Sequence, residues 1–191
     1  TYAMARAAGL KADVCKTIAT AAEFVDDNAG HQNLNAKDKG HLHVTATAHH
    51  SVDGDNLEND DQRLVWVPFH FLPGNEGDSY ELRLQCVKDS DIAREMLQHH
   101  LSRANKAYSH HLIGVAAHVY ADTFAHYGFS GISSEANYID DDTFEFDSKL
   151  PSDSMSYILK KWTRFKTSLE GDAAEALSKG LGHGAAHTYP D

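Results

Sequence analysis

The segment from His110 to Gly131 constrains the fold of this chain more than any other segment. Its apolar residues recur at the spacing of an α-helix and not with the alternation of a β-strand, at Leu112, Val115, Val119 and Phe124. Gly128 and Gly131 mark the end of the pattern. We therefore predict one long helix here and expect the rest of the chain to be organised around it.

The same helix carries the pattern H-x-x-x-D-x-x-x-H, made by His118, Asp122 and His126. At about 100° per residue, His118 and Asp122 fall within roughly 40° of each other and of His111 around the helix axis, and His126 lies about 40° further on. Imidazoles and a carboxylate on one stripe can bind one metal ion, or two ions that share the carboxylate. A single histidine would be better explained as a core residue bonded to a carbonyl, but this pattern on an apolar helix favours a metal site.

Composition and charge bound the possible functions. The 191 residues are 41% apolar and 24% charged, which suits a single globular domain over residues 1–191 without disulfides. The 28 acidic residues against 17 basic ones give a net charge of −11, and an acidic surface repels polyphosphate backbones. We therefore expect no stable binding to duplex nucleic acid. The 14 histidines are unusually many and need a reason.

Targeting and redox signals are few. The chain has no run of 18 apolar residues, so we expect no transmembrane segment. It also has no signal-peptide pattern, which favours a cytoplasmic location, but we expect residues to be missing at both ends, which leaves secretion open. Cys15 and Cys86 form no disulfide framework, and Cys15 is predicted to be a small core residue.

Several further segments have helical patterns. They are residues 1–8, residues 11–25, a helix capped by Asp89 or Ser90 and running through Ala107, a helix from Ser152, and residues 172–179. The predicted inward faces comprise Val14, Ile18, Ala22 and Val25, then Ile92, Met96 and Leu101, and then Met155, Ile158, Leu159, Trp162 and Phe165. The alternating piece at 41–50 is a candidate strand. We predict an all-α, single-domain helical bundle with long loops and room for one short β-hairpin.

Two candidate ligand positions lie outside the central helix. Asp26 and Asp27 end the helix of residues 11–25, where carboxylates are unfavourable against the helix dipole and need a solvated turn or a metal ion to compensate them. His70 lies between Phe69 and Phe71, and an imidazole in apolar surroundings is costly unless it has a partner. We predict that His70 is a ligand, with a core histidine as the alternative.

The other histidines are weaker candidates. His49 is the preferred ligand among the four histidines of residues 41–50, and the roles of His41, His43 and His50 are left open. His183 and His187 lie in a glycine-rich tail that could fold a ligand back onto the site, and the role of His187 is also left open. His99 and His100 are predicted to be ordinary surface or interface residues.

Three motifs resemble those of the zinc-dependent phospholipase C and single-strand nuclease superfamily, which comprises all-helical phosphodiesterases with a three-zinc cluster. They are FVDD at 24–27, PFHF at 68–71 and HVYAD at 118–122. In that superfamily the next histidine follows the bridging aspartate by six residues and a proline, whereas His126 follows Asp122 by four. The superfamily's final His-x-x-x-acid pair is matched only by His187 and Asp191, where Pro190 prevents a helix. The chain also resembles, over most of its length, an uncharacterised bacterial family within or near this superfamily.

This resemblance implies a metal centre with assigned roles. Asp26, His70, His118 and Asp122 would hold the first of two or three divalent ions, most simply zinc. His126, with His183 or His49, would hold another, and Asp27 would orient a ligand imidazole. Asp122 would bridge two ions, with each of its carboxylate oxygens facing a different one.

The expected function is metal-dependent hydrolysis of a phosphoester. A metal-bridged hydroxide would attack phosphorus, and the substrate would be a small phosphoester or a lipid headgroup. Two alternatives stay open, a non-catalytic metal-binding or scaffold protein and a hydrolase of amide or other bonds. The sequence leaves the substrate and the oligomeric state open.

Overall fold

The computed structural model describes residues 1–37, 40–49, 58–137 and 149–166. Its helices are α1 (Tyr2–Ala7), α2 (Ala12–Asp27), α3 (Asn59–Leu64), α4 (Trp66–Phe69), α5 (Tyr80–Leu84), α6 (Asp91–Leu101), α7 (Ser109–Ala125) and α8 (Ser152–Lys166), with a 3-10 turn, η2, at Glu135–Asn137. The strands are β1 (Gln32–Ala36) and β2 (Gly40–Val44). Among the helices described, none is long and apolar enough to span a membrane, as predicted.

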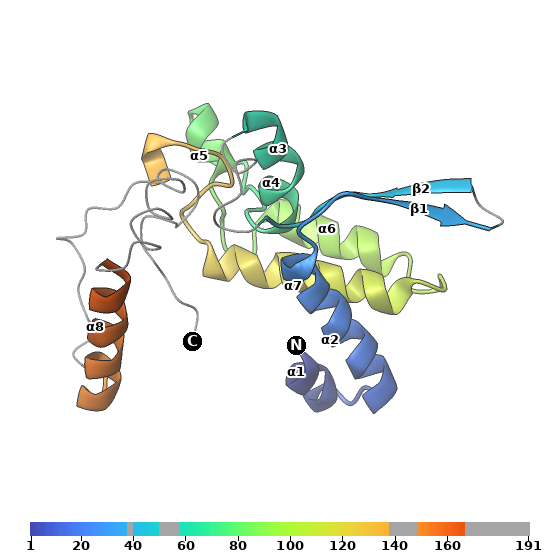
Figure 1. Ribbon diagram of the computed structural model, residues 1–191, viewed down its shortest axis with the longest axis horizontal. Coiled ribbons are helices and arrows are strands. Elements are labelled where there is room, and N and C mark those ends of the chain that lie inside the picture. The colour runs from blue at the N-terminus through green and yellow to red at the C-terminus, as the bar shows by residue number, and fades with distance from the viewer. Residues whose placement is uncertain (38–39, 50–57, 138–148, 167–191) are drawn as a thin grey trace.

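The fold is helical with one short antiparallel hairpin, which confirms the predicted fold class (Figure 1). In the hairpin, Leu34 lies opposite Leu42 and Asn33 lies opposite His43. The two strands project from the helices, and their side chains are largely exposed (Figure 1). The hairpin begins a few residues after α2 ends, so it leaves the body of the molecule close to Asp26.

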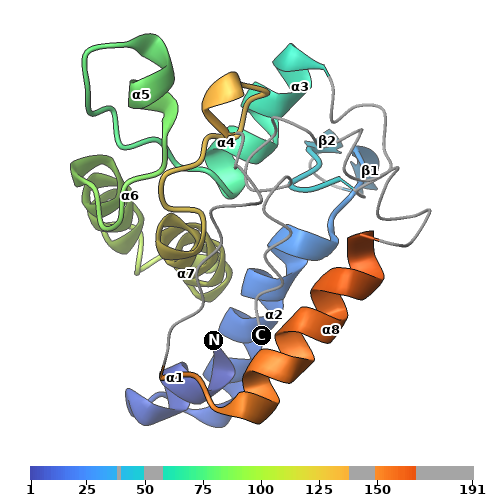
Figure 2. The ribbon, with the colours of Figure 1, turned by 90° about the vertical axis from the view of Figure 1, so that its left-hand side faces the viewer.

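The core is built around α7, which lies between α6 and α2 (Figure 2). The buried residues of α2 recur every three or four positions, at Cys15, Ile18, Ala21, Ala22 and Val25. The two helices approach closely at Gly114, where an added Cβ would lie 2.4 Å from the Ile18 carbonyl oxygen. The absence of a side chain at Gly114 therefore permits the crossing that brings the end of α2 to the middle of α7.

The central helix is shorter than predicted. It ends at Ala125, so His126 is its C-cap residue, and Gly128 with a φ of 86° turns the chain back. Phe124, one of the apolar residues of the helical pattern, is exposed. The bond from the His126 amide to the Asp122 carbonyl still continues the helical pattern, at 2.8 Å, so the two side chains stay one turn apart on the same side.

The preceding helix, α6, begins as predicted, because the Ser90 hydroxyl accepts a hydrogen bond from the Ala93 amide at 3.2 Å. It ends at Leu101, several residues earlier than predicted. Leu101 is 59% exposed, so the prediction that it faces inward is wrong.

Helix α8 begins at the predicted position, Ser152. Its predicted core face is not buried, since Ile158 and Leu159 are exposed and Met155 is half-buried. The side chains of Trp162 and Phe165 and the helix predicted for residues 172–179 lie outside what the structure describes. The amphipathic pattern of α8 therefore specified a helix, but not one packed into the core.

Candidate metal centre

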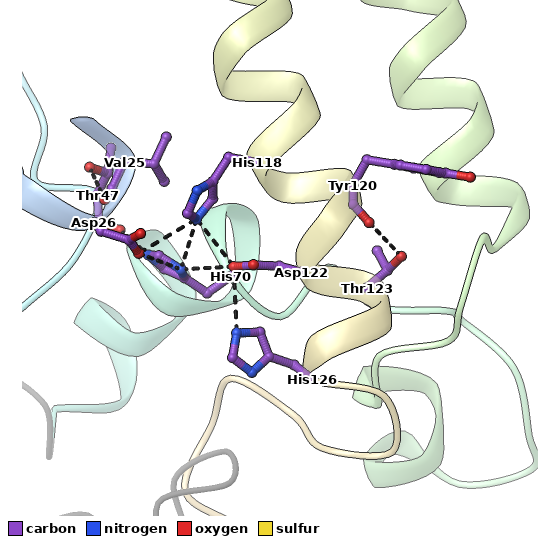
Figure 3. A network of polar contacts seen from close by, with 9 residues as sticks. All are labelled: Val25, Asp26, Thr47, His70, His118, Tyr120, Asp122, Thr123 and His126. Carbon is purple, nitrogen blue, oxygen red and sulfur yellow. Dashed lines mark hydrogen bonds and ion pairs between the residues drawn. The ribbon is translucent and has the colours of Figure 1, made fainter. Parts of the chain in front are cut away.

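Five of the predicted ligands lie together where three helices meet (Figure 3). Asp26 comes from the last turn of α2 and His70 directly follows α4. The C-terminal half of α7 supplies His118 and Asp122, and its C-cap residue is His126. These residues are up to 100 positions apart in the chain. The fold, and not local sequence, therefore assembles the cluster.

The side chains converge on one carboxylate oxygen. Asp122 Oδ2 lies 3.0 Å from His70 Nδ1, 3.2 Å from His118 Nε2 and 3.5 Å from His126 Nε2. All three contacts thus involve the same oxygen, which differs from the prediction that each oxygen of Asp122 faces a different ion. On the other side of the cluster, Asp26 Oδ1 lies 3.6 Å from His118 Nε2 and 3.8 Å from His70 Nδ1.

These distances are compatible with ligands around one ion. Zinc held tetrahedrally at about 2.0–2.1 Å separates its ligand atoms by about 3.4 Å. The nitrogens of His70 and His118 are 3.4 Å apart, and the other contacts in the cluster run from 3.0 to 3.8 Å. The side chains are thus already spaced to bind a zinc-sized ion.

The donors form two overlapping groups of three, in each of which all donor atoms lie within 4.8 Å of one another. One group is Asp26, His70 and His118, and the other is His70, Asp122 and His126. His70 belongs to both groups, but a neutral imidazole nitrogen has one lone pair and so binds one ion. Both groups therefore cannot be filled at once through His70, and a second ion would depend on Asp122 as the shared ligand.

His70 is oriented by its other ring nitrogen. His70 Nε2 lies 2.9 Å from the carbonyl oxygen of Thr47, which can only accept, so Nε2 carries the proton and donates it. In a neutral imidazole this leaves a lone pair on Nδ1, directed at Asp122 Oδ2 only 3.0 Å away. Two acceptors at this distance require a proton or a cation between them, and a metal ion meets that requirement.

Electrostatics at the cluster favour ionised Asp122. Burial raises the pKa of its carboxyl, but the neighbouring imidazoles of His118, His126 and His70 outweigh burial and hold the pKa well below its usual range. For His118, burial lowers the pKa, yet the bond to Asp122 and the nearby charge of Asp26 together raise it. The cluster thus holds an anionic carboxylate that attracts positive charge, whether a proton on His118 or a metal ion.

The cluster is buried at one end and open at the other. The side chain of His70 is 5% exposed, whereas that of Asp26 is 58% exposed. Solvent or a small ligand can therefore reach the Asp26 side of the cluster, while His70 lies at its buried end.

Among the described residues, the remaining predicted site residues do not join the cluster. His49 is buried, but its Nε2 lies 2.6 Å from Asp61 Oδ2 and is not grouped with the other ligands. Asp27 is exposed, and its carboxylate has no contact with a ligand imidazole among the described residues, so nothing in its position supports the predicted orienting role. His183 lies outside the described residues, as do His50 and His187.

The other histidines singled out in the sequence are also apart from the cluster. His41 and His43 lie on the exposed strand β2, and His111 is exposed near the start of α7. His99 is exposed at the end of α6, as predicted. The helical stripe predicted from His111 to His126 therefore reaches the cluster only from His118 onward.

Three residues support the cluster, and only Phe71 among them was named from the sequence, as a neighbour of His70. The Thr47 carbonyl fixes His70, the Trp66 ring lies 5.1 Å from the His70 ring, and the Phe71 ring lies 4.4 Å from the His126 ring. The aromatic run around His70 was a signal for the two rings. A main-chain carbonyl such as that of Thr47 leaves no signal in a sequence, because every residue has one.

Comparison with known proteins gives a family but no function. Residues 1–191 match a family of unknown function, DUF6765. No curated protein and no solved structure matches the chain. The resemblance to the zinc-dependent phospholipase C and nuclease superfamily therefore stays a prediction that rests on its three motifs.

Proposed function

The chain belongs to DUF6765, a family of unknown function, and we propose that it is a zinc-dependent hydrolase of phosphoesters. The observation that carries this proposal is the convergence of three imidazole nitrogens on Asp122 Oδ2, next to the half-exposed carboxylate of Asp26. Nitrogen and carboxylate donors at these separations suit zinc, and a site open on one side suits catalysis better than a closed structural shell.

In this proposal the ligands are divided between two ions. Asp26, His70 and His118, with Asp122 beside them, would hold the first ion, and Asp122 and His126 would contribute to the second. The second ion has fewer donors in the described part of the chain, so water or substrate oxygens would complete its coordination. We therefore expect this ion to be the more weakly bound of the two.

In the proposed reaction the protein positions the metal ions and the substrate. Bound zinc ions would activate a water molecule and stabilise the negative charge that develops on the phosphoryl oxygens. Asp122 would fix the spacing between the ions, and its negative charge would reduce their mutual repulsion. The substrate would approach from the side of Asp26, because the His70 end is buried.

One observation favours a non-catalytic alternative. His70 is buried and joins segments from three parts of the chain, since it contacts Thr47, Asp122 and Trp66. An ion at such a junction could act only as a structural link between α2, α4 and α7. Hydrolytic activity in the metal-loaded protein is what separates the two functions.

The first experiment measures metal content and activity in the same preparation. Protein purified without chelator should contain at least two divalent ions per chain, mainly zinc, by elemental analysis. It should hydrolyse bis(4-nitrophenyl) phosphate or 4-nitrophenyl phosphate, and chelation should abolish this activity. Two ions without any phosphoester hydrolysis would support the scaffold alternative, and no bound metal would refute both.

A further inference from the structure

Residues 45–49, which we call the strap, run from the end of β2 past the end of α2 to the metal centre. The side chain of Asn28, the C-cap residue of α2, donates a hydrogen bond to the Thr45 carbonyl oxygen at 2.7 Å. The Thr47 hydroxyl donates to the Val25 carbonyl oxygen at 2.8 Å. Both bonds use side chains, so the sequence of the strap and of the helix end fixes how they are joined.

Main-chain bonds then set the direction of one carbonyl. The amides of Thr47 and Ala48 both donate to the Asn28 carbonyl oxygen, at 3.0 and 3.3 Å. In a trans peptide the N–H and C=O groups point in opposite directions. Because the Ala48 N–H points at Asn28, the Thr47 carbonyl in the same peptide points away from α2, and it accepts the hydrogen bond from His70 Nε2 at 2.9 Å.

The far end of the strap is anchored separately. His49 Nε2 lies 2.6 Å from Asp61 Oδ2 on α3, and both His49 and the carboxylate are largely buried. The Trp66 ring is a neighbour of both histidines, with its centroid 6.4 Å from that of the His49 ring and 5.1 Å from that of the His70 ring. His49, predicted as a metal ligand, is thus placed to hold the strap.

We propose that the strap is a positioning device that sets the tautomer of His70. By holding the Thr47 carbonyl against Nε2, it keeps the proton on Nε2 and leaves the Nδ1 lone pair facing Asp122 and the ion site. Asn28, Thr47 and His49 with Asp61 are positioning residues, since none of them is a ligand in the cluster. The effect on zinc affinity rests on the proposed function, whereas the tautomer of His70 does not.

Weakening the strap should act as the loss of a hydrogen-bond partner of a metal ligand does. An imidazole without a fixed partner exchanges between tautomers and ring orientations, and only one of them presents Nδ1 to the ion. Loss of such partners typically lowers metal affinity about 10–100-fold. The loss arises without removal of any ligand atom.

Two variants weaken the strap and a third is a matched control. Asn28→Ala removes the bond to Thr45, and Thr47→Val removes the hydroxyl while keeping the shape and the carbonyl. Asn137→Ala is the control, because Asn137 is also buried and its amide also donates to carbonyl oxygens, those of Ser130 and Ile132. All three variants should lower thermal stability.

Two readouts separate positioning from stability. Competition with a chromophoric chelator gives the Kd for Zn²⁺, which should rise about 10–100-fold in the two strap variants and stay near wild type in the control. Two-bond 1H–15N spectra of the zinc-free protein show which ring nitrogen carries the proton. His70, identified by the signals lost in His70→Asn, should carry a proton on Nε2 in wild type and in the control, whereas the Nε2 signal of the strap variants should shift toward that of an unprotonated nitrogen.

The inference is overturned if both strap variants keep the wild-type Kd and the wild-type His70 tautomer, or if Asn137→Ala changes them equally. If the wild type binds no zinc, the proposed function fails, while the spectra still decide whether the strap sets the tautomer. If Asn28→Ala does not fold, Asp61→Asn replaces it, because this variant weakens the ion pair between His49 and Asp61 at the other end of the strap. The same two readouts apply.

Discussion

At the scale of single residues, Asp122 is the centre of the site. Its Oδ2 is the common neighbour of His70, His118 and His126, and these imidazoles keep the pKa of its carboxyl low. Asp122→Asn retains the shape of the side chain but loses its charge and an anionic oxygen. The variant should therefore lose more than one zinc ion per chain by elemental analysis, together with phosphoester hydrolysis.

The control for this prediction is His99→Ala on the neighbouring helix α6, where His99 is exposed. This variant should keep both metal content and activity. Equal metal content in Asp122→Asn and in the wild type would show that Asp122 is not shared between ions, and would favour unrelated histidines over one site.

A second residue-scale prediction concerns Cys86, a buried thiol. Burial, together with the charge of Asp122, raises its pKa from 9.0 to about 12. The unfolded chain releases this proton at a lower pH than the native protein does. The thiol therefore contributes stability that is fully present below about pH 9 and is lost as the pH rises toward about 12.

The measurement is urea unfolding of the wild type and Cys86→Ala, under reducing conditions, from pH 8 to pH 11. The difference in the free energy of unfolding cancels the titrations that the two proteins share. It should be constant up to about pH 9, and the advantage of the wild type should then shrink. A difference that stays constant to pH 11 would show that the folded-state pKa of Cys86 is not raised.

The residue types in the sequence predicted which side chains are ligands, but they did not predict what surrounds each side chain. The ligands at the end of α2 and along α7 could be found because carboxylate and imidazole side chains recurred at a helix end and at helical spacing. His70 could be found because it lies between two phenylalanines. His49 could not be assigned, because an imidazole serves equally as a metal ligand or as the partner of a carboxylate such as Asp61. Only the fold decides which of these an imidazole meets.

At the scale of elements, the crossing of α2 and α7 decides whether the ligands meet. Asp26 lies in the last turn of α2, so a small shift of this helix moves its carboxylate away from His118. Gly114→Ala places a methyl group 2.4 Å from the Ile18 carbonyl and 2.7 Å from the Ala21 side chain. Because the first contact is with main chain, the helices must separate, at a cost of about 1–3 kcal/mol.

We therefore expect Gly114→Ala to lower both the free energy of unfolding and zinc affinity. Urea denaturation and zinc titration measure the two effects. Gly30→Ala is the matched control, since an added Cβ there has no atom within 4 Å. Unchanged zinc affinity in a destabilised Gly114→Ala protein would show that the site tolerates movement of α2.

Local sequence patterns predicted several of the helices. Contacts with distant parts of the chain determined which faces of those helices are buried. The helix of residues 11–25, the Ser90 cap and the start of α8 all follow from periodicity and capping, which depend on neighbours in sequence. The same patterns did not predict that Leu101 and Ile158 are exposed. Burial depends on which distant elements cover a helix face, and an amphipathic pattern cannot specify that.

At the scale of the whole molecule, the metal centre links elements that are otherwise distant in the chain. The end of α2, the strap, α4 and the end of α7 meet around His70 and Asp122, whereas α6 contacts α7 on its other side (Figures 2 and 3). An ion that binds only the folded state stabilises that state by mass action. Its contribution should therefore be greatest in the segments that supply ligands.

Chelation tests this on the native protein. Removal of zinc should lower the Tm, since ligands preassembled at 3.0–3.8 Å gain their binding energy only in the folded chain. Amide hydrogen exchange should accelerate most in residues 24–28, 66–71 and 118–126, and least in α6, which serves as an internal control. Re-addition of zinc should restore the protection and the Tm. If chelation accelerated exchange equally in α6 and in the ligand segments, the ion would stabilise the fold globally. If it changed neither quantity, the cluster would be held by its imidazole–carboxylate hydrogen bonds alone.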